Sequence, residues 1–299
     1  MPSDTIPLFV NPAAGRGRAA RRVDRLRTIF ARADIATELR LSRSEGDLED
    51  QIHSIALSGV DRIVVAGGDG SVHEAVNGIM RAGGTAALGL IPTGTGNDFA
   101  KACSISLDWQ HATEQLAKRL ATGTPLRRID VGRMNDRFFA NGAGIGFDAR
   151  VTRAARAYHW PKGDLVYLLA VLRCMADGIP TPELSITAGD YRFVGPVTLA
   201  SISNGPWVGG MFHIAPIADN ADGKFELLIA DPVSRLRILS LLPALIRGKH
   251  MGKPEIRHES VRSVHIRAVA PLPSQLDGEV QPLQKDFEIG ILPAALDVL

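Results

Sequence analysis

The sequence predicts an α/β domain with a parallel sheet, followed by a second, mainly β domain of sandwich-like form. Two observations support this. Short apolar strands alternate with helical segments between residues 6 and 121, which is the pattern of a parallel sheet with right-handed crossovers. From residue 127 onward, short strands and turns replace the alternation. We expect a first domain over residues 1–125, a second over 126–287, and a final segment from about 288 to 299 that returns to the first domain.

Four strands are expected in the first domain, over residues 6–10, 37–41, 62–66 and 87–91. Apolar and β-branched side chains dominate the last two, as in strands that are buried on both faces. Helical spacing of apolar residues predicts helices over residues 15–33, 46–57 and 107–121, and another that begins near Ser71.

A glycine-rich turn follows the third strand and opens onto this last helix. Gly67, Gly68 and Gly70 let the backbone approach a ligand closely. The free N–H groups and the dipole of the helix N-terminus then favour an anion such as phosphate. Asp69 would repel phosphate unless a cation lies between them, so we interpret it as a ligand of Mg²⁺ or of a Mg²⁺-bound water. The alternative is a structural turn in which Asp69 caps the helix.

Two further loops have the same character. The strand over residues 87–91 runs into Pro92-Thr93-Gly94-Thr95-Gly96-Asn97-Asp98-Phe99-Ala100, where Asn97 or Asp98 could cap a following helix. The first strand runs into Asn11-Pro12-Ala13-Ala14-Gly15. Because the carboxyl ends of neighbouring parallel strands meet at one edge of the sheet, the three loops predict a crevice for nucleotide phosphates.

Composition limits the classes of protein to consider. The chain has 299 residues, of which 45% are hydrophobic and 22% charged, as in soluble globular domains. A net charge of +2 gives no indication of a nucleic-acid partner. The two cysteines, Cys103 and Cys174, argue against a disulfide framework. No apolar run reaches the roughly 18 residues of a membrane span, and no signal-peptide pattern is present, so we expect a cytoplasmic protein.

In their order and spacing, the three loops resemble the diacylglycerol kinase catalytic family, which includes bacterial soluble lipid kinases and the sphingosine and ceramide kinases. The resemblance implies a Rossmann-like first domain of the NAD kinase and diacylglycerol kinase type. It also implies a β-sandwich-like second domain, with the active site in the cleft between the two. ATP would be the phosphoryl donor and Mg²⁺ the cofactor.

The resemblance also implies which residues act. ATP and Mg²⁺ binding would fall to Asn11, Pro12, Gly15, Ser42, Gly67, Gly68, Asp69, Gly70, Ser71, Glu74, Thr95, Asn97 and Asp98. Ser71 stands where many members have threonine. In the family, the motif matched by Asp277-Gly278-Glu279 supplies the catalytic base; we prefer Glu279 narrowly over Asp277.

A second magnesium site is implied near residues 219–224. In bacterial members this loop binds a structural Mg²⁺, and the matching ligands would be the Asp222 carboxylate and the main-chain oxygens of Asp219 and Lys224. The alternative is an ordinary Asp-Gly hairpin turn.

The family points to a lipid hydroxyl as the acceptor, with diacylglycerol converted to phosphatidic acid. A sphingoid base, phosphatidylglycerol, a soluble acceptor such as NAD or a sugar phosphate, and a binding module without turnover stay open. The sequence lacks the Gly-x-x-x-x-Gly-Lys-Ser/Thr pattern of a P-loop. The apolar helix expected over residues 234–247 has basic flanks and is the best candidate for peripheral contact with a membrane. The alternative, which is more common for a single helix of this type, is a core-packing helix with basic ends. Family members often form homodimers.

Overall fold

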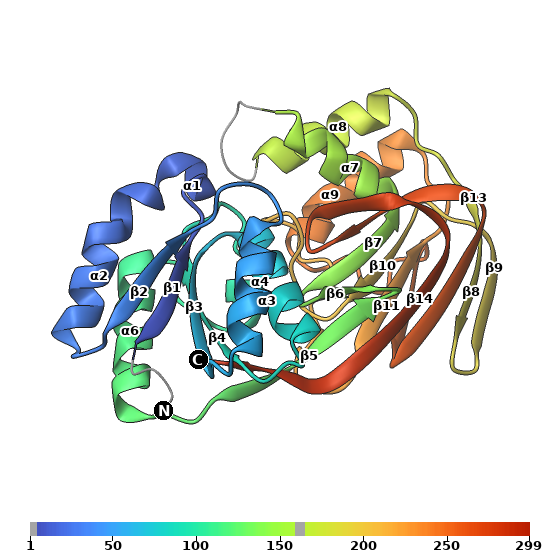
Figure 1. Ribbon diagram of the computed structural model, residues 1–299. Coiled ribbons are helices and arrows are strands. Elements are labelled where there is room, and N and C mark those ends of the chain that lie inside the picture. The colour runs from blue at the N-terminus through green and yellow to red at the C-terminus, as the bar shows by residue number, and fades with distance from the viewer. Residues whose placement is uncertain (1–4, 159–164) are drawn as a thin grey trace. The chain divides into compact units, whose positions relative to one another are not determined.

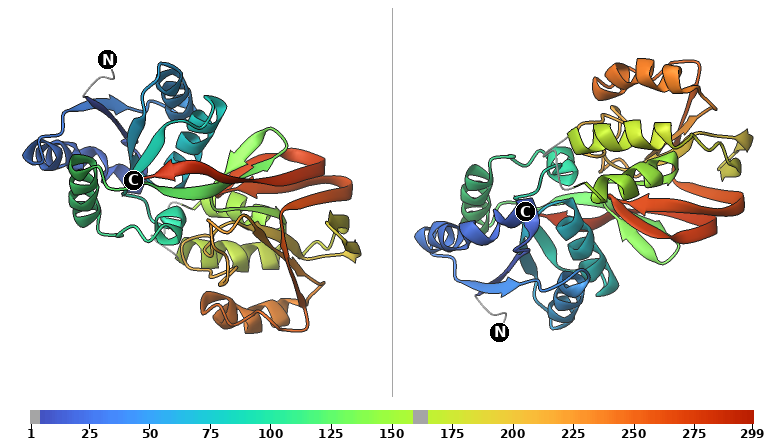
Figure 2. Two further views of the ribbon diagram at one scale, coloured as in Figure 1. Left: turned by 90° about the horizontal axis from the view of Figure 1, so that it is seen from below. Right: turned by 90° about the horizontal axis from the view of Figure 1, so that it is seen from above.

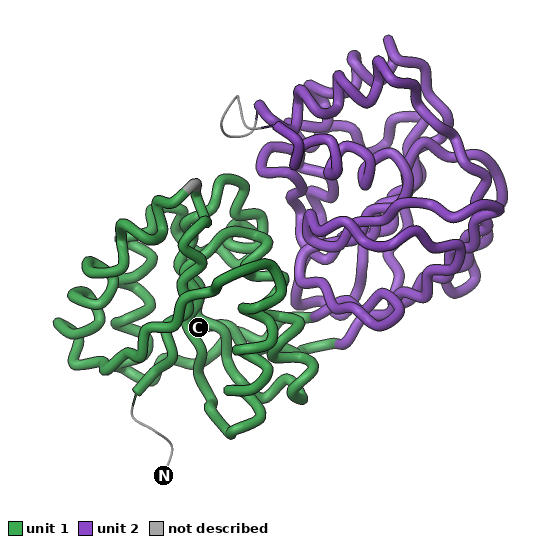
Figure 3. Tube along the Cα trace, turned by 45° about the horizontal axis from the view of Figure 1, so that its top comes forward, with its two compact units in different colours: residues 1–130, 293–299 green, residues 131–292 purple. Residues whose placement is uncertain are grey.

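The computed structural model describes residues 5–158 and 165–299, which fold into two compact units (Figure 3). Unit 1 takes the chain as far as Asp130 and again from Pro293 to Leu299. Unit 2 is Val131–Leu292. Two strands therefore pass from one unit to the other, β5 (Arg127–Met134) and β14 (Glu279–Val298).

Unit 1 is built on the parallel sheet that the sequence predicts (Figure 1). Its strands are β1 (Ile6–Val10), β2 (Thr37–Leu41), β3 (Arg62–Gly67) and β4 (Ala87–Pro92), in the order β2-β1-β3-β4. All of their pairings are parallel. The end of β14 joins beside β4, with Val298 opposite Leu88.

Helices cover both faces of this sheet. They are α1 (Ala14–Gly17), the 3-10 turn η1 (Ala20–Arg22), α2 (Val23–Arg32), α3 (Asp47–Leu57), α4 (Asp69–Arg81), α5 (Asp98–Ala102) and α6 (Trp109–Thr122). Figure 2 shows α2 and α6 on one face and α3 and α4 on the other. Leu26, Phe30 and Leu116 form part of the buried core beneath α2 and α6.

The single helix expected over residues 15–33 is wrong. The chain forms α1, η1 and α2 in its place. Gly15 and Gly17 have φ angles of +59° and +81°, and a left-handed backbone interrupts a right-handed helix.

Unit 2 is mainly β, as predicted. Its antiparallel strands are β7 (Gly142–Gly146), β10 (Leu199–Ser203), β11 (Phe225–Ala230), β12 (Ile256–Val261) and β13 (Ser263–Leu276), in the order β12-β11-β10-β7-β13-β14. The strand β8 (Glu183–Ala188) pairs with β13, and β9 (Tyr191–Pro196) pairs with β8. The short strand β6 (Arg137–Phe139) pairs with β5. Fully buried Phe139, Phe225 and Phe287 lie in the core of this unit.

Three helices form a second apolar cluster in unit 2. They are α7 (Phe147–Arg156), α8 (Leu165–Ala176) and α9 (Arg235–Ile246). Pro243 lies inside α9 without ending it. Among the residues described, none of the helices is long and apolar enough to cross a membrane.

Candidate active site

The three predicted loops meet in unit 1, after β1, β3 and β4. A Cβ atom added to Gly94 would lie 2.5 Å from the Cα of Gly68, and one added to Gly15 would lie 2.3 Å from the carbonyl oxygen of Thr93. Only glycine leaves room for such close backbone approach. The three loops therefore converge at one edge of the parallel sheet, as the sequence predicts.

A side-chain contact joins the first loop to the second. Nδ2 of Asn11 donates to Oγ of Ser71 at 3.2 Å. Ser71 is buried in the first turn of α4, and a Cβ on Gly67 would lie 2.4 Å from that same Oγ. The hydroxyl of Ser71 is thus held at the start of the helix, where the unpaired backbone N–H groups lie.

Replacing Gly94 by alanine is expected to separate these loops. The added methyl would meet backbone atoms of Gly68, which cannot rotate away as a side chain could. We expect a loss of about 1–3 kcal/mol in the free energy of unfolding, the usual cost of overpacking, together with weaker nucleotide binding. Thermal denaturation and nucleotide titration measure both. Gly290→Ala is the matched control because its added Cβ would have open space; equal effects of the two variants would contradict the expectation.

The carboxylate of Asp69 reaches across to the third loop. Its Oδ1 accepts from the backbone N–H of Asp98 at 2.6 Å and of Phe99 at 3.3 Å. These amides are the first of α5, and the N-cap residue Asn97 forms no side-chain cap there. Asp69 therefore caps α5 from a distance, whereas the sequence alternative had it capping its own helix.

Burial makes this carboxyl hard to ionise. Removal from water, followed by the repulsion of Asp98, raises the pKa of Asp69 to about 7, although the backbone N–H bonds act in the opposite direction. Asp98 is only 7% exposed and pairs with Nζ of Lys101 at 3.1 Å. Two neighbouring carboxyls that repel each other are a donor set that fits a hard divalent cation such as Mg²⁺.

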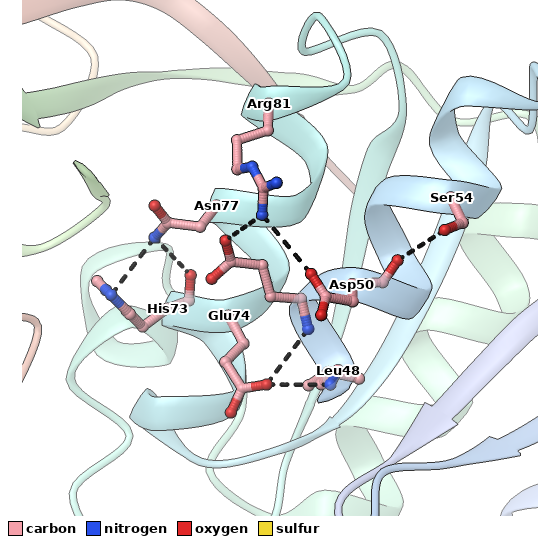
Figure 4. Close-up of polar contacts among 8 residues, drawn as sticks. Leu48, Asp50, Ser54, His73, Glu74, Asn77 and Arg81 are labelled. Atoms are coloured by element: carbon pink, nitrogen blue, oxygen red, sulfur yellow. Dashed lines mark hydrogen bonds and ion pairs between the residues drawn. The ribbon is translucent and has the colours of Figure 1, made fainter. Parts of the chain in front are cut away.

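Glu74 has a structural contact that the sequence did not reveal. One carboxylate oxygen, Oε2, accepts from the backbone N–H of Leu48 at 3.1 Å and of Glu49 at 3.2 Å (Figure 4). It thereby caps α3, whose N-cap residue, Gly46, has no side chain for the purpose. Arg81 adds an ion pair with Glu49 at 2.7 Å. Glu74 thus joins α3 to α4, and its assignment to nucleotide binding stays a prediction.

The remaining predicted residues of unit 1 lie in or beside the same loops. The N–H of Ser42 donates to the carbonyl of Val10 at 3.1 Å, which holds Ser42 beside the end of β1. Asn97 has a φ angle of 51°, and its Oδ1 accepts from the N–H of Gly94 at 3.1 Å. Thr95 is exposed. Pro12 follows β1, and Gly70 lies in the first turn of α4.

In unit 2, Asp277 and Gly278 form the two-residue turn between β13 and β14. Leu276 and Glu279 are paired across it, and the φ angles of 51° at Asp277 and 87° at Gly278 are those of a type I′ turn. The Asp277 carboxylate accepts from the N–H groups of Ala140, Asn141 and Gly142 at 2.8–3.0 Å. Asp277 therefore fastens the turn to the start of β7.

Glu279 has different surroundings. Its carboxylate forms an ion pair with the guanidinium of Arg156, and its side chain is 25% exposed. Arg156 also donates to the carbonyl oxygen of Gly278 at 3.3 Å. Of the two candidate bases, Glu279 has the carboxylate that contacts a side chain and solvent, whereas that of Asp277 accepts from three backbone amides.

The loop predicted to hold a structural Mg²⁺ lies before β11. Oδ1 of Asp222 accepts from the N–H of Lys224 at 2.9 Å, and Oδ1 of Asp219 accepts from the N–H of Ala221 at 3.1 Å. All three predicted ligand residues are exposed. All of the predicted metal ligands are oxygen atoms, which is the type of ligand that Mg²⁺ prefers.

Unit 2 also contains an apolar cavity that sequence reasoning missed. Its lining includes Val151, Val171, Leu228, Leu242 and Leu245, from α7, α8, β11 and α9. The centre of a water-sized sphere can occupy about 140 Å³ of it, whereas one water needs about 10–15 Å³. The apolar residues of α9 were the one signal in the sequence, but the cavity needs three helices and a sheet to form it.

The fold and these residues define a class: an α/β unit with glycine-rich loops after three parallel strands, joined to a β-sandwich unit with an acidic hairpin turn. A sequence model of the diacylglycerol kinase catalytic domain matches residues 5–134. A model of the YegS C-terminal NAD kinase beta sandwich-like domain matches residues 142–299. The chain belongs to the diacylglycerol kinase catalytic domain family, which is a family of phosphotransferases.

Individual relatives agree with this assignment. A diacylglycerol kinase of Mycobacterium tuberculosis (strain ATCC 25618 / H37Rv) is 33% identical over 263 residues, which cover 85% of this chain and 82% of the relative. A diacylglycerol kinase of Bacillus subtilis (strain 168) is 29% identical and covers 91% and 88%. The crystal structure of a diacylglycerol kinase from Bacillus anthracis str. Sterne has the same fold, with a TM-score of 0.74, 21% identity, and coverage of 99% and 96%.

Proposed function

We propose that this protein transfers the γ-phosphate of ATP to the hydroxyl group of a lipid, with diacylglycerol converted to phosphatidic acid. The observation that carries the proposal is the apolar cavity of unit 2. A lipid acceptor needs a place for its acyl chains, and aliphatic side chains of three helices and a sheet line this one. A soluble acceptor such as NAD or a sugar phosphate has no apolar part of this kind.

The glycine loops of unit 1 support the donor half of the proposal. Backbone N–H groups at the start of α4 and in the loop after β4 would bind the phosphates of ATP, with Asn11 and Ser71 beside them. Asp69 and Asp98 would hold Mg²⁺, directly or through its water. When bound, this ion neutralises the charge that spreads over the transferred phosphoryl group.

Glu279 is the proposed general base. The acceptor hydroxyl loses its proton to the Glu279 carboxylate as its oxygen attacks the γ-phosphorus, and ADP leaves with the electrons of the broken P–O bond. Arg156 would hold the Glu279 side chain through their ion pair. Asp277 would act on position only, by fixing the turn that carries Glu279.

Peripheral contact with a membrane is part of the proposal, because the acceptor is a membrane lipid. Leu236 and Leu239 on α9 are 79% and 41% exposed, whereas Ile238 and Leu242 of the same helix line the cavity. Apolar side chains on the outer side of a helix with basic neighbours are suited to a bilayer surface.

The experiment is phosphate transfer from labelled ATP, with Mg²⁺, to a panel of acceptors. Diacylglycerol, a sphingoid base and phosphatidylglycerol are offered in mixed micelles, and NAD and sugar phosphates in solution. We expect label in diacylglycerol. Label in a soluble acceptor alone, or in none of the acceptors, would overturn the proposal.

A cavity variant tests the acyl-chain part. Val171→Trp places a larger side chain in the lining, so we expect KM for a long-chain lipid to rise at least about tenfold, as when a pocket loses several methylene contacts, with KM for ATP unchanged. Leu172→Trp is the matched control, since Leu172 is the next residue on α8, is 39% exposed and does not line the cavity. Equal KM values in the two variants would argue against the cavity as the acyl site.

A further inference from the structure

Tyr167, in the first turn of α8, lies against both the apolar cavity of unit 2 and the turn that carries the proposed base. Its side chain is part of the cavity lining. Its hydroxyl oxygen lies 3.8 Å from the position that a Cβ atom on Gly278 would occupy. Gly278 directly precedes Glu279. The same side chain therefore extends from the place proposed for the acyl chains toward the place proposed for the reacting hydroxyl.

The ring of Tyr167 is held against the backbone. A Cβ atom on Gly209 would lie 2.8 Å from Cδ1 of this ring and 3.0 Å from its Cγ. Gly209 has a φ angle of +62° and also belongs to the cavity lining. Because only glycine leaves room for this contact, the ring packs directly on the chain and its hydroxyl has a defined direction.

Hydrogen bonds hold the other side of this contact, Gly278, in place. Its N–H donates to Oε1 of Gln275 at 2.7 Å, and its carbonyl oxygen accepts from Arg156 at 3.3 Å. Gln275 is itself fixed by Asp148, whose Oδ2 accepts from Nε2 of Gln275 at 2.7 Å. The separation between the Tyr167 hydroxyl and the turn is thus set by contacts on both sides.

The middle of an acceptor lipid would lie beside this hydroxyl. In diacylglycerol, two ester groups join the acyl chains to the glycerol that carries the reacting hydroxyl. With the chains among the aliphatic side chains of the cavity and the reacting hydroxyl at Glu279, the ester groups would lie between the two, where the Tyr167 hydroxyl is. An ester carbonyl oxygen accepts hydrogen bonds and a phenol hydroxyl donates one. Tyrosine suits such a boundary, since its ring is apolar and its tip is polar.

We propose that Tyr167 is a specificity-determining residue for the acceptor: its hydroxyl donates a hydrogen bond to an ester carbonyl and so favours ester-linked over ether-linked lipids. The inference rests on the proposed function and deepens it, because it names the part of the lipid that is recognised. An ether lacks the carbonyl oxygen. A site that is built to hydrogen-bond a ligand discriminates against an analogue that leaves its polar group unpaired.

The test compares wild type with Tyr167→Phe, which keeps the ring on Gly209 and removes the hydroxyl. Binding of water-dispersible dioctanoylglycerol and of its ether counterpart, dioctylglycerol, is measured by calorimetry without ATP, and kcat/KM is measured for both with ATP. In the variant we expect Kd for the ester to rise about threefold to tenfold, the usual effect of one neutral hydrogen bond. Kd for the ether should change less than about twofold. The ratio of the two changes isolates the bond between the hydroxyl and the carbonyl.

Tyr191→Phe is the matched control, because it removes a hydroxyl on β9, outside the cavity lining, and should leave both Kd values unchanged. An equal rise for ester and ether in Tyr167→Phe, no change in either, or the absence of ester binding to wild type would overturn the inference. If the ratio shifts as stated but neither lipid is phosphorylated, the inference holds and the proposed kinase activity fails. If both lipids are phosphorylated and the ratio does not shift, the kinase activity holds and the inference fails.

Discussion

Glu279→Gln is expected to reduce phosphoryl transfer by about 10²–10⁴-fold, the usual contribution of a general base, and to leave the fold intact. The amide cannot take the proton of the acceptor hydroxyl. Its oxygen can still accept from Arg156, whose ion pair with Glu279 lies at a partly exposed position, and such pairs contribute about 0–1 kcal/mol to stability. Steady-state kinetics with saturating lipid measure the loss of phosphoryl transfer, and thermal denaturation measures whether the fold stays intact.

Asp277→Asn should lower the stability of the fold rather than the rate of phosphoryl transfer. Its carboxylate accepts from three backbone N–H groups, and the amide would turn an NH₂ group toward at least one of them. Because hydrogen bonds to a charged group contribute about 1.5–3 kcal/mol, we expect a loss of about 2 kcal/mol in the free energy of unfolding. Catalysis lost in Asp277→Asn at full stability, with activity kept in Glu279→Gln, would make Asp277 the base. Glu288→Gln, an exposed position on β14, which follows the turn, serves as the control.

Asp69→Asn is expected to abolish activity and to stabilise the unliganded protein. A neutral amide cannot hold Mg²⁺ as a carboxylate does, so transfer should fall at least about 10³-fold, in line with the removal of electrostatic stabilisation of a transition state. The amide oxygen can still accept from the N–H groups of Asp98 and Phe99. The cost of burying a charge beside Asp98 disappears, so we expect a gain of up to about 4 kcal/mol in the free energy of unfolding near pH 8, since each pKa unit corresponds to about 1.4 kcal/mol.

The stabilisation should depend on pH in a defined direction. The pKa of Asp69 is raised in the folded protein to about 7, so the folded state holds the proton that the unfolded state releases near pH 4. The ionisation of Asp69 therefore lowers the stability of the wild type as pH rises from about 4 through 7, and Asp69→Asn lacks this contribution. The difference in Tm between them should be small at pH 4 and largest near pH 8. A difference that is the same at both values would mean that charge is not its cause. Asp61→Asn, an exposed carboxylate in unit 1, is the control.

Much of unit 1 could be predicted because its signals are local. The strand over residues 6–10 and the one over 37–41 occupy the same residues in the sequence analysis and in the structure, and β3 and β4 are each one residue longer than expected. At β3, a run of β-branched residues followed by glycine identifies both the strand and the end of the strand. The converging loops follow from strand order, which parallel α/β topology restricts to few arrangements.

What the sequence could not provide depends on contacts between distant residues. The amides that Asp69 caps lie 29 and 30 positions away, and the residues that Glu74 caps lie 25 and 26 away. Asp148 and Gln275 are 127 positions apart. No periodicity or motif relates such pairs, since they meet only when whole strands and helices pack. The prediction of one continuous helix after β1 is wrong for a local reason. Glycine at positions 15 and 17 permits a left-handed backbone but does not require one, so the sequence alone does not reveal the interruption.

The return of β14 to unit 1 has a consequence for how the protein is made. The ribosome releases residues 5–130 first and then the whole of residues 131–292. The last segment follows only afterwards. In it, Val298 pairs with Leu88, and the N–H of Leu299 donates to the carbonyl oxygen of Leu88. During that interval one side of β4 lacks its final partner, and an unpaired strand edge invites association with other chains. A genetic fragment that ends after residue 130 would keep this open edge permanently. A stable version of unit 1 would therefore need residues 293–299 joined to it by a linker.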